Sequence, residues 1–178
     1  MEITTTRSMW ELTLEHLKAA TVDPDHPFKL ITLATLGFYP EGRTVVLRDV
    51  DEQLHFWIYA DSRTPKVSQI RRNPNVSLLA YHVISGLQVR IKGRARLHTS
   101  GEKYLNARNE ILSQPNDYNS QFPPGSEKVA SVKSETIYFI LIEIIPQEWD
   151  VLQLGSPTHS RAKYVFLNDQ WKGYEVIP

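Results

Sequence analysis

The feature that most constrains the fold is a series of short β-type segments after residue 27. Runs rich in Val, Ile, Leu and Thr alternate with turn residues along most of the chain. Strands of this length at regular spacing favour a closed antiparallel barrel over a parallel βαβ sheet. The expected strands are Phe28–Leu36, Thr44–Val50, Gln53–Ala60, Val76–Val83, Leu87–His98, Thr136–Ile145, Ala162–Leu167 and Trp171–Ile177.

Short turn sequences join several of these runs. Asp51-Glu52 and Ser85-Gly86 each separate two runs by the short connection that a β-hairpin uses. Asn168 and Asp169 form a third such turn, and Gly37–Gly42 is a longer turn-rich stretch. The hairpins indicate that most neighbouring strands are antiparallel.

A few helices flank the strands. Ser8 and Glu11 have the spacing of a capping box, and Pro65 has the favoured first-turn place of a proline. Helices are therefore expected at Ser8–Ala20, Pro65–Arg72 and Gly101–Leu112, with a surface loop at Ser113–Ser126 and a further short helix at Glu127–Lys133. The sequence predicts a mainly β protein with flanking helices (α+β), forming one domain across residues 1–178.

Composition excludes several classes of protein. The chain has no cysteine, so disulfides, thiolate metal sites and cysteine nucleophiles are excluded. Its longest apolar run, Ile137–Ile145, is interrupted by Glu143 and is far shorter than the roughly 18 residues that cross a bilayer. Met1–Arg7 lacks the basic-then-apolar pattern of a secretory signal. We expect a cytoplasmic protein with no membrane partner.

The charges are unevenly distributed although the net charge is zero. Between Arg43 and Arg96 there are ten Lys and Arg but four Asp and Glu, so this segment has six excess positive charges. A nucleic-acid-binding protein is usually basic throughout, so no nucleic-acid partner is expected. A basic segment within a neutral chain suits one compact anion, such as a phosphate group.

Familiar catalytic and metal motifs are absent from the sequence. The six histidines show no paired helical spacing, so no metal site is expected. There is no phosphate-loop motif, no dinucleotide-binding glycine fingerprint and no nucleophile elbow around a serine. Hydrolase chemistry is unsupported, and no catalytic residue is assigned.

Two groups of cations are candidates for phosphate binding. Arg43 and Arg48 lie on one expected strand, on opposite faces unless a bulge intervenes. Arg63 and Lys66 precede or begin the expected Pro65–Arg72 helix, whose free N–H groups favour an anion. The alternative is that these are ordinary solvated surface charges. Basic residues also alternate with apolar ones along Leu87–His98, which indicates a half-buried strand.

The ordered series of segments resembles the pyridoxamine 5′-phosphate oxidase family. The resemblance covers about residues 28–98, with a weaker match at 149–178, and no single motif in it is specific. The matching segments are RTVVLR (43–48), FWIYA (56–60), DSRTPK (61–66), IRRNP (70–74), VSLLAY (76–81) and QVRIKG (88–93).

This resemblance implies an antiparallel split β-barrel that dimerises and binds flavin mononucleotide (FMN) at the subunit interface. Arg43 and Lys66 correspond to phosphate-binding residues, Arg63 stands in for a family arginine that aligns with Pro65, and Gln88 corresponds to a contact with the isoalloxazine edge. A family threonine is replaced by Ala60, which leaves a backbone contact there. The implied FMN-binding residues are Arg43, Val45, Val46, Leu47, Arg48, Tyr59, Ala60, Arg63, Lys66, Gln88, Trp149 and Arg161.

The substrate side resembles the family less closely. The family's Arg-x-His-x-Arg signature corresponds to Pro157-Thr-His159-Ser-Arg161, so its first arginine is missing. Tyr104 and Arg108 resemble the substrate-phosphate pair and are neighbours on a helix, although an ordinary surface helix explains them equally well. The implied substrate residues are Arg48, Tyr104, Arg108 and His159.

Several functions remain open from the sequence. The first is an FMN-dependent oxidoreductase acting on a small molecule, of which pyridoxamine or pyridoxine 5′-phosphate oxidation is the specific version. The second is a non-catalytic FMN-binding or stress-related interaction protein. A split barrel recruited to haem or a deazaflavin, and a purely structural barrel, are the further alternatives.

Overall fold

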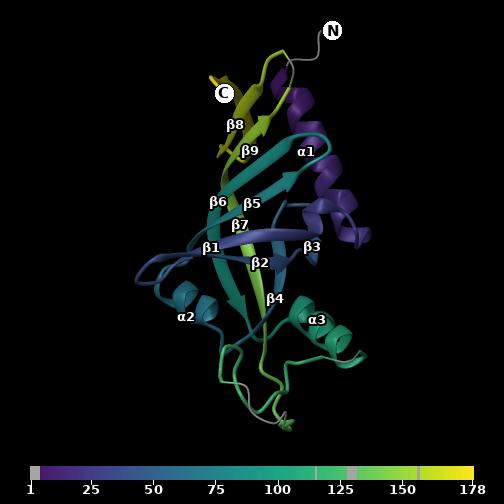
Figure 1. Ribbon diagram of the computed structural model, residues 1–178, viewed down its shortest axis with the longest axis vertical. Coiled ribbons are helices and arrows are strands. Elements are labelled where there is room, and N and C mark those ends of the chain that lie inside the picture. The colour runs from purple at the N-terminus through teal and green to yellow at the C-terminus, as the bar shows by residue number, and fades with distance from the viewer. Residues whose placement is uncertain (1–4, 115, 128–131, 156) are drawn as a thin grey trace.

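The computed structural model describes residues 5–114, 116–127, 132–155 and 157–178. The elements along the chain are α1 (Thr5–Val22), the 3-10 turn η1 (Pro27–Lys29), β1 (Leu30–Leu36), β2 (Pro40–Val46), β3 (Asp49–Val50), β4 (Phe56–Asp61), α2 (Pro65–Arg72), β5 (Asn75–His82), β6 (Leu87–His98), α3 (Glu102–Leu112), β7 (Phe139–Gln153), β8 (Ser160–Leu167) and β9 (Gln170–Val176). The predicted mainly β architecture with flanking helices is confirmed (Figure 1).

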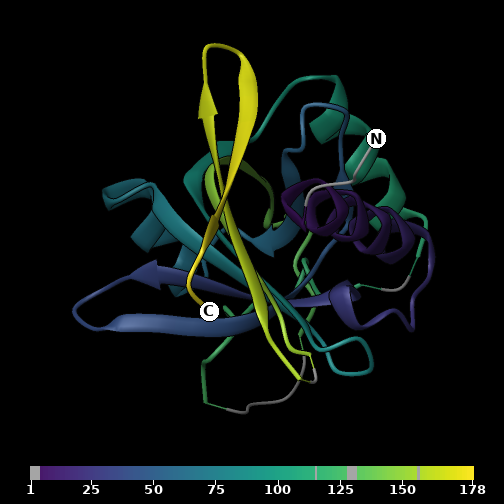
Figure 2. The same cartoon turned by 90° about the horizontal axis from the view of Figure 1, so that it is seen from above.

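All strand pairs among these elements are antiparallel. The main order is β2-β1-β5-β6-β7-β4-β3, with β8 added on β7 and β9 on β8. The sheet twists strongly, so the β1–β2 and β8–β9 hairpins point in different directions when seen from above (Figure 2). Helices α2 and α3 lie at the opposite end of the molecule from the β8–β9 hairpin (Figure 1).

Strand β7 divides the sheet into two parts. One of its edges pairs with β6 along its length, whereas the other pairs first with β4, at Phe139–Ile144, and then with β8, at Glu148–Gln153. Between these partners lies Pro146, which has no N–H to donate and pairs with Gly93 on β6, and the next residue, Gln147, is the extra residue of a β-bulge on β7. The strand was expected to end at residue 145, but it continues because the bulge accommodates the proline.

The predicted strand Thr44–Val50 is two elements in the structure. β2 ends at Val46, and β3 begins at Asp49. Between them the backbone changes partner: Leu47 N–H donates to Lys29 C=O at 2.8 Å, and Arg48 N–H donates to Trp57 C=O at 2.9 Å. The chain therefore passes from the β1 side of the sheet to the β4 side at these two residues.

Other predicted elements agree closely with the structure. Helix Pro65–Arg72 and strand Leu87–His98 have the predicted bounds, and Gly101 is the N-cap of α3 instead of its first residue. Asn168 and Asp169 both have positive φ, 50° and 60°, as a type I′ hairpin turn requires. Most of the expected helix Glu127–Lys133 lies outside the described residues, but Lys133 forms an isolated β-bridge with Ser120.

Two hydrophobic clusters hold the elements together. The larger cluster fills the inside of the curved sheet. Helix α1 contributes Trp10, whose ring lies 5.3 Å from Trp149, 4.6 Å from Tyr164 and 5.7 Å from Trp171, measured between centroids. The smaller cluster lies under α3 and includes Trp57. Among the described residues, no helix is long and apolar enough to span a membrane.

Candidate functional site

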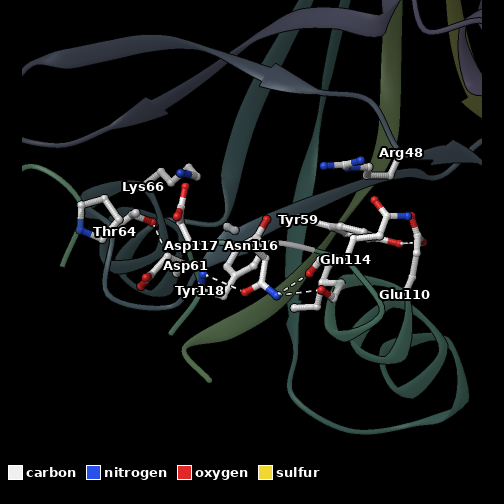
Figure 3. Close-up of a pocket in the computed structure, with 13 residues that line it drawn as sticks. Arg48, Tyr59, Asp61, Thr64, Lys66, Glu110, Gln114, Asn116, Asp117 and Tyr118 are labelled. Carbon is white, nitrogen blue, oxygen red and sulfur yellow. Dashed lines mark hydrogen bonds between the residues drawn. The ribbon is translucent and has the colours of Figure 1, made fainter. Parts of the chain in front are cut away.

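A cavity of about 450 Å³ opens between the end of β4, the start of α2 and the end of α3. Its size lies within the range of small-molecule sites, roughly 300–1,000 Å³. The described residues that line it are Arg48, Tyr59, Ala60, Asp61, Thr64, Lys66, Glu110, Ile111, Gln114, Asn116, Asp117, Tyr118 and Pro124. Lys66 and Thr64 lie at one end of this cavity, and Arg48 and Glu110 lie at the other (Figure 3).

The Lys66 end of the cavity is built by the tight connection from β4 to α2. Thr64 is the N-cap of α2, and its hydroxyl donates to Asp61 C=O at 2.7 Å. Pro65 occupies the first turn, where its missing N–H costs nothing. This arrangement directs the start of α2 and the Lys66 side chain toward the cavity.

Positive charge is concentrated beside Lys66. Burial, and then the positive charge of Arg43, hold the pKa of the Lys66 amine below its ordinary value, although Asp61 acts in the opposite direction. Asp61 is itself paired with Arg63, whose Nη2 lies 2.7 Å from Asp61 Oδ2. Two neighbouring cations that repel each other in a partly buried place suit an anionic group.

Arg43 is held by neutral and acidic partners next to this end of the cavity. Its Nη1 donates to Thr35 Oγ1 at 2.5 Å, and its Nη2 donates to Gln69 Oε1 at 3.2 Å and Glu41 Oε2 at 3.1 Å. Of the described residues, Arg43 is not one that lines the cavity. Its charge acts on Lys66 from the layer behind.

Arg63 is engaged elsewhere in the structure. Its guanidinium is paired with Asp61, lies over the Tyr138 ring at 3.6 Å, and donates to the C=O groups of Gln121 and Phe122. It anchors the loop that forms one wall of the cavity, but it does not itself line the cavity. Its role at a phosphate remains a prediction.

The opposite end of the cavity brings Arg48, Tyr59 and Glu110 together. The Tyr59 hydroxyl donates to Glu110 Oε2 at 2.7 Å, which joins β4 to α3. The Arg48 guanidinium lies over the Tyr59 ring, 4.8 Å from its centroid. Burial and the Glu110 carboxylate raise the pKa of the Tyr59 hydroxyl, so it remains a hydrogen-bond donor at neutral pH.

In the RTVVLR segment (43–48), some backbone N–H and C=O groups point away from the sheet. The side chains of Val45 and Leu47 are buried. Because Leu47 N–H donates to Lys29, the alternation of an antiparallel ladder turns the N–H and C=O of Val46 away from β1, toward the open edge of β2. A ligand contact from this segment would therefore use backbone atoms.

Gln88 and Arg161 lie at the far end of the sheet from this cavity. Both face Leu152 on β7, from β6 and β8, and so share one face of the sheet. Tyr59 faces Leu141, eleven positions earlier on β7, which corresponds to about 36 Å at roughly 3.3 Å per residue. Within one chain, the predicted site residues therefore form two separate groups.

Asp150 holds Arg161, a member of the second group, in one orientation. Asp150 accepts two hydrogen bonds from Arg161, at 2.8 and 2.7 Å, and one from Arg90 at 2.5 Å. The Arg161 hydrogen bonds, together with Arg90, lower the pKa of Asp150 to about 2, against the opposing effect of burial. Arg161 is thus presented in a fixed orientation at the sheet surface.

The predicted cofactor contact of Trp149 needs correction. Its side chain is fully buried, between Trp10, Phe56 and Trp171. Because the indole packs in the interior, it does not reach a surface on which a cofactor binds. Trp149 belongs to the hydrophobic core and is not carried into the proposed site.

The predicted substrate residues, apart from Arg48, do not line the cavity. Tyr104 stacks on Phe139 within the cluster under α3, with ring centroids 5.4 Å apart. Arg108 is partly buried on α3, but the cavity is lined by its helix neighbours Glu110 and Ile111. His159 is exposed in the β7–β8 connection, where its Nδ1 accepts from Gly155 N–H at 3.1 Å.

The sequence did not identify several residues that line the cavity. Asn116, Asp117 and Tyr118 belong to the stretch that was expected to be a surface loop. Its polar composition fits a loop anywhere on the surface, so no local signal links it to the cavity. Glu110 was missed for the same reason, because an acidic residue on an amphipathic helix is ordinarily solvated.

Three histidines also come together, contrary to what their spacing suggested. His16, His26 and His82 each place a ring nitrogen within 4.8 Å of the others. However, Nδ1 of His26 accepts from Phe28 N–H, and Nδ1 of His82 accepts from Ser85 N–H, both at 3.1 Å. Neutral imidazoles held in this way carry their proton on Nε2. This hydrogen bonding favours a neutral histidine cluster over metal ligation.

Comparison with known proteins identifies the family. The sequence profile of the family described as "Pyridoxamine 5′-phosphate oxidase, FMN-binding domain" matches residues 7–99, more than half of the chain. The chain belongs to this family. Its cofactor is accordingly FMN, and the Lys66 end of the cavity fits the phosphate of that cofactor.

A curated relative is similar to this chain in sequence. A pyridoxine/pyridoxamine 5′-phosphate oxidase of Legionella pneumophila (strain Lens) is 28% identical over 143 residues, which cover 79% of this chain and 57% of the relative. The chain thus spans little more than half the length of that relative.

The solved structures place the chain in the split-barrel fold. A pyridoxamine 5′-phosphate oxidase-related, FMN-binding protein of Nostoc punctiforme PCC 73102 has a TM-score of 0.73 at 19% identity, with complete coverage of both chains. PhzG of Burkholderia lata 383, solved with tetrahydrophenazine-1-carboxylic acid, has a TM-score of 0.71 at 17% identity and covers 96% of this chain and 91% of its own. The predicted antiparallel split β-barrel is confirmed.

Proposed function

We propose that the protein is an FMN-dependent oxidoreductase that acts on a small substrate and works as a homodimer. The observation that carries this proposal is the 450 Å³ cavity with Lys66 at one end and the Arg48, Tyr59 and Glu110 group at the other. This arrangement suits an elongated ligand with a phosphate at one end and a polar ring at the other.

At the phosphate end, Lys66 would bind the phosphate directly. The start of α2 would add the Lys66 N–H and the positive end of the helix dipole, since Pro65 has no N–H and Val67 N–H donates to Thr64 C=O. Arg43 adds positive potential from behind. The phosphate would offset the repulsion between the two cations. Its binding would therefore return the pKa of Lys66 toward the ordinary value.

At the ring end, the chain would orient the isoalloxazine with main-chain and aromatic groups. Tyr59 and Ala60 line the cavity, and Val46 directs its backbone polar groups to the open edge of β2. FMN supplies the redox chemistry when it is bound. The protein would position the ring, limit the access of water and orient the substrate beside it.

The homodimer is proposed because the predicted FMN contacts are divided between two ends of the sheet. Gln88 and Arg161 lie about 36 Å along β7 from the level of Tyr59, at roughly 3.3 Å per residue, so they cannot reach the same flavin from the same chain. A symmetric dimer would bring this second group from one subunit to the cavity of its partner. Each site would then contain residues of both chains.

The substrate is proposed as a small molecule related in chemistry to pyridoxamine or pyridoxine 5′-phosphate. The Legionella pneumophila relative has that name, and this chain matches 57% of its length. The position of the family's first signature arginine is Pro157 here, so the phosphorylated vitamin is one candidate among others. A cytoplasmic location, favoured by the absence of cysteine, and a single domain are parts of the same proposal.

The test is a visible spectrum of the purified protein, followed by anaerobic titration with pyridoxine 5′-phosphate. We expect flavin absorbance, or its appearance on reconstitution with FMN. Bleaching on addition of the substrate would support the vitamin B6 oxidase version. Absorbance that stays oxidised with this and other small amines and alcohols would favour a non-catalytic FMN-binding protein. A protein that cannot be loaded with FMN would overturn the proposal.

A further inference from the structure

Two buried polar side chains lie next to the phosphate end of the proposed FMN site. Thr35 on β1 is 4% exposed, and Gln69 on α2 is 7% exposed. Neither is among the described residues that line the cavity, and neither is one of the predicted FMN contacts. A buried hydroxyl or amide lowers stability unless its hydrogen bonds are made, so the partners of this pair indicate what the pair does.

The hydrogen bonds of Gln69 fix the direction in which its amide faces. Its Nε2 donates to Glu41 Oε1 at 2.6 Å. Its Oε1 accepts from Thr35 Oγ1 at 2.5 Å and from Arg43 Nη2 at 3.2 Å. The reverse orientation would turn the amide oxygen toward a carboxylate and the amide hydrogens toward a guanidinium. Gln69 therefore has one stable orientation, with its donor on the acid and its acceptor on the base.

The absence of a side chain at Gly37 leaves room for this arrangement. A Cβ at that position would lie 2.8 Å from Gln69 Nε2 and 2.8 Å from Glu41 Oε1. Any larger residue would displace the amide or the carboxylate. The space that a side chain would fill is thus occupied by the hydrogen bond between Gln69 and Glu41.

The same network engages both terminal nitrogens of Arg43. Nη1 donates to Leu33 C=O at 3.1 Å and to Thr35 Oγ1 at 2.5 Å. Nη2 donates to Gln69 Oε1 and to Glu41 Oε2. Three of these four acceptors are neutral, and the carboxylate of Glu41 is 45% exposed, so solvent screens its charge. The guanidinium is therefore fixed in place and still contributes positive potential.

Helix α2 connects this network to Lys66. Lys66 and Gln69 are three positions apart on α2, so they are neighbours on one side of the helix. Lys66 lines the cavity, and Gln69 contacts Arg43 behind it. The charge of Arg43 is close enough to lower the pKa of the Lys66 amine, in addition to the larger effect of burial. Gln69 thus sets the position of the Arg43 charge relative to the end of the cavity that suits a phosphate.

We propose that Gln69 is a positioning residue for the cofactor phosphate, and that it enables the site to prefer FMN over riboflavin, the same flavin without the phosphate. Fixed by Gln69 and Thr35, Arg43 adds its charge to the phosphate end that Lys66 forms. Without these acceptors the guanidinium would move toward solvent, where its attraction for a phosphate is weaker. This inference rests on the proposed placement of the FMN phosphate at Lys66.

The test compares the affinities for FMN and riboflavin by fluorescence titration. The two ligands differ only in the phosphate, so the ratio of their dissociation constants reports contacts to the phosphate, whereas riboflavin affinity reports an intact ring site. Gln69→Met is close in size but has no amide acceptor. We expect it to weaken FMN binding by about tenfold and to leave riboflavin binding nearly unchanged. Gln170→Met, at an exposed position on β9, is the control and should change neither affinity.

An exchange of amide and carboxylate separates positioning from general destabilisation. Gln69→Glu removes the Nε2 donor and places a second carboxylate against Glu41 and Arg43, so the preference for FMN should fall further than in Gln69→Met. Adding Glu41→Gln restores one amide and one carboxylate, with donor and acceptor interchanged. We expect this double variant to bind FMN more tightly than Gln69→Glu alone, a non-additive result.

The outcomes distinguish the role of Gln69 from the placement of FMN. If Gln69→Met lowers both affinities equally, or changes neither, while Lys66→Met lowers the preference for FMN, the role of Gln69 is wrong and the phosphate site stands. If Lys66→Met leaves the preference unchanged as well, the proposed placement of FMN fails.

Thr35→Val decides the case in which Gln69→Met binds no flavin at all. This variant keeps the size of the side chain and removes the hydroxyl that accepts from Arg43. A lowered preference for FMN would support the role of the network, and an unchanged preference would overturn it.

Discussion

Arg43 on β2 donates a hydrogen bond to Gln69 on α2 at 3.2 Å, and Gln69 Nε2 in turn donates to Glu41 at 2.6 Å. This contact ties the edge strand to the helix that begins with Pro65 and Lys66. The contact places the charge of Arg43 near Lys66, while the Arg43 guanidinium already has hydrogen-bond acceptors in Thr35, Glu41 and Gln69. In the proposed site, the cation that would contact the ligand, Lys66, and the cation that strengthens the local potential, Arg43, are therefore different residues.

Lys66→Met should separate cofactor binding from stability. We expect the affinity for FMN to fall by about 10- to 100-fold, as for the loss of a charge-assisted phosphate contact. The protein without FMN should be as stable as before or slightly more stable, because the variant removes a partly buried cation beside Arg43. Fluorescence titration with FMN and urea denaturation would measure the two effects.

A control for this variant is Lys18→Met, which changes an exposed lysine on α1. It should alter neither quantity. If Lys66→Met destabilised the FMN-free protein strongly and left FMN affinity unchanged, Lys66 would be a structural residue and the assignment of the phosphate end would be incorrect.

Mixed dimers should test whether each site is shared between subunits. Lys66→Met and Arg161→Met alter the two separate groups of predicted FMN contacts. In a heterodimer of the two variants, one site would carry both changes and the other none. After random exchange, about one quarter of all sites should regain normal FMN affinity. Sites confined to single chains would show no recovery on mixing.

Asp150→Asn should lower the free energy of unfolding and leave the Arg161 side chain less firmly oriented. We expect the free energy of unfolding at neutral pH to fall by about 1–3 kcal/mol, because Asp150 is buried and accepts charge-assisted hydrogen bonds. The depressed pKa of Asp150 means that this stabilisation is present above about pH 4 and is lost as the pH falls to about 2. Asp25→Asn, at an exposed position, is the control for urea denaturation. A difference between Asp150→Asn and the unaltered protein that is independent of pH would contradict this explanation.

The histidine cluster should make the fold sensitive to mild acid. Burial and the charge of His82 lower the pKa of both His16 and His26, with Glu15 and Asp23 acting weakly in the opposite direction. The unfolded chain then binds more protons than the folded one, so stability should decrease as the pH falls below about 6.5. His82→Asn keeps an acceptor for Ser85 N–H and should make this decrease shallower. Denaturation midpoints between about pH 5 and 7.5 would measure it, since Asp150 titrates well below that range.

Gly93→Ala should destabilise the region where β7 changes partner. A Cβ at this position would lie 2.4 Å from Ile145 O and 3.0 Å from Ile145 C, both backbone atoms that cannot move independently. We expect a loss of roughly 1–3 kcal/mol, as for overpacking in a core. In Gly42→Ala the nearest atom would be the Thr32 Cγ2 at 3.5 Å, so this variant should be close to neutral in thermal unfolding. Equal stability of both variants would show that the bulge adapts.

Local patterns in the sequence were enough to predict many elements. The alternation along Leu87–His98 and the proline start of Pro65–Arg72 gave the bounds that the structure has, because each pattern reports which face of its own segment is buried. Family resemblance also selected Arg48, Tyr59, Ala60 and Lys66, which the fold brings together around one cavity.

Tertiary contacts decided the features that these patterns could not reveal. The length of β7 depends on Gly93, a residue on another strand that admits Pro146. The burial of Trp149 depends on Trp10 of α1, and the histidine cluster depends on three segments that meet only in the folded chain.

The sequence by itself determined the class of fold, because the periodicity and order of short segments indicate antiparallel strands, and its resemblance to a known family indicated FMN. Only the tertiary structure decided that Glu110 accepts a hydrogen bond from Tyr59 at one end of the cavity, and that Gln88 and Arg161 lie far from Lys66. The physical reason is that side-chain periodicity specifies a face of a strand or helix, whereas the partner across a cavity is set by how distant segments pack.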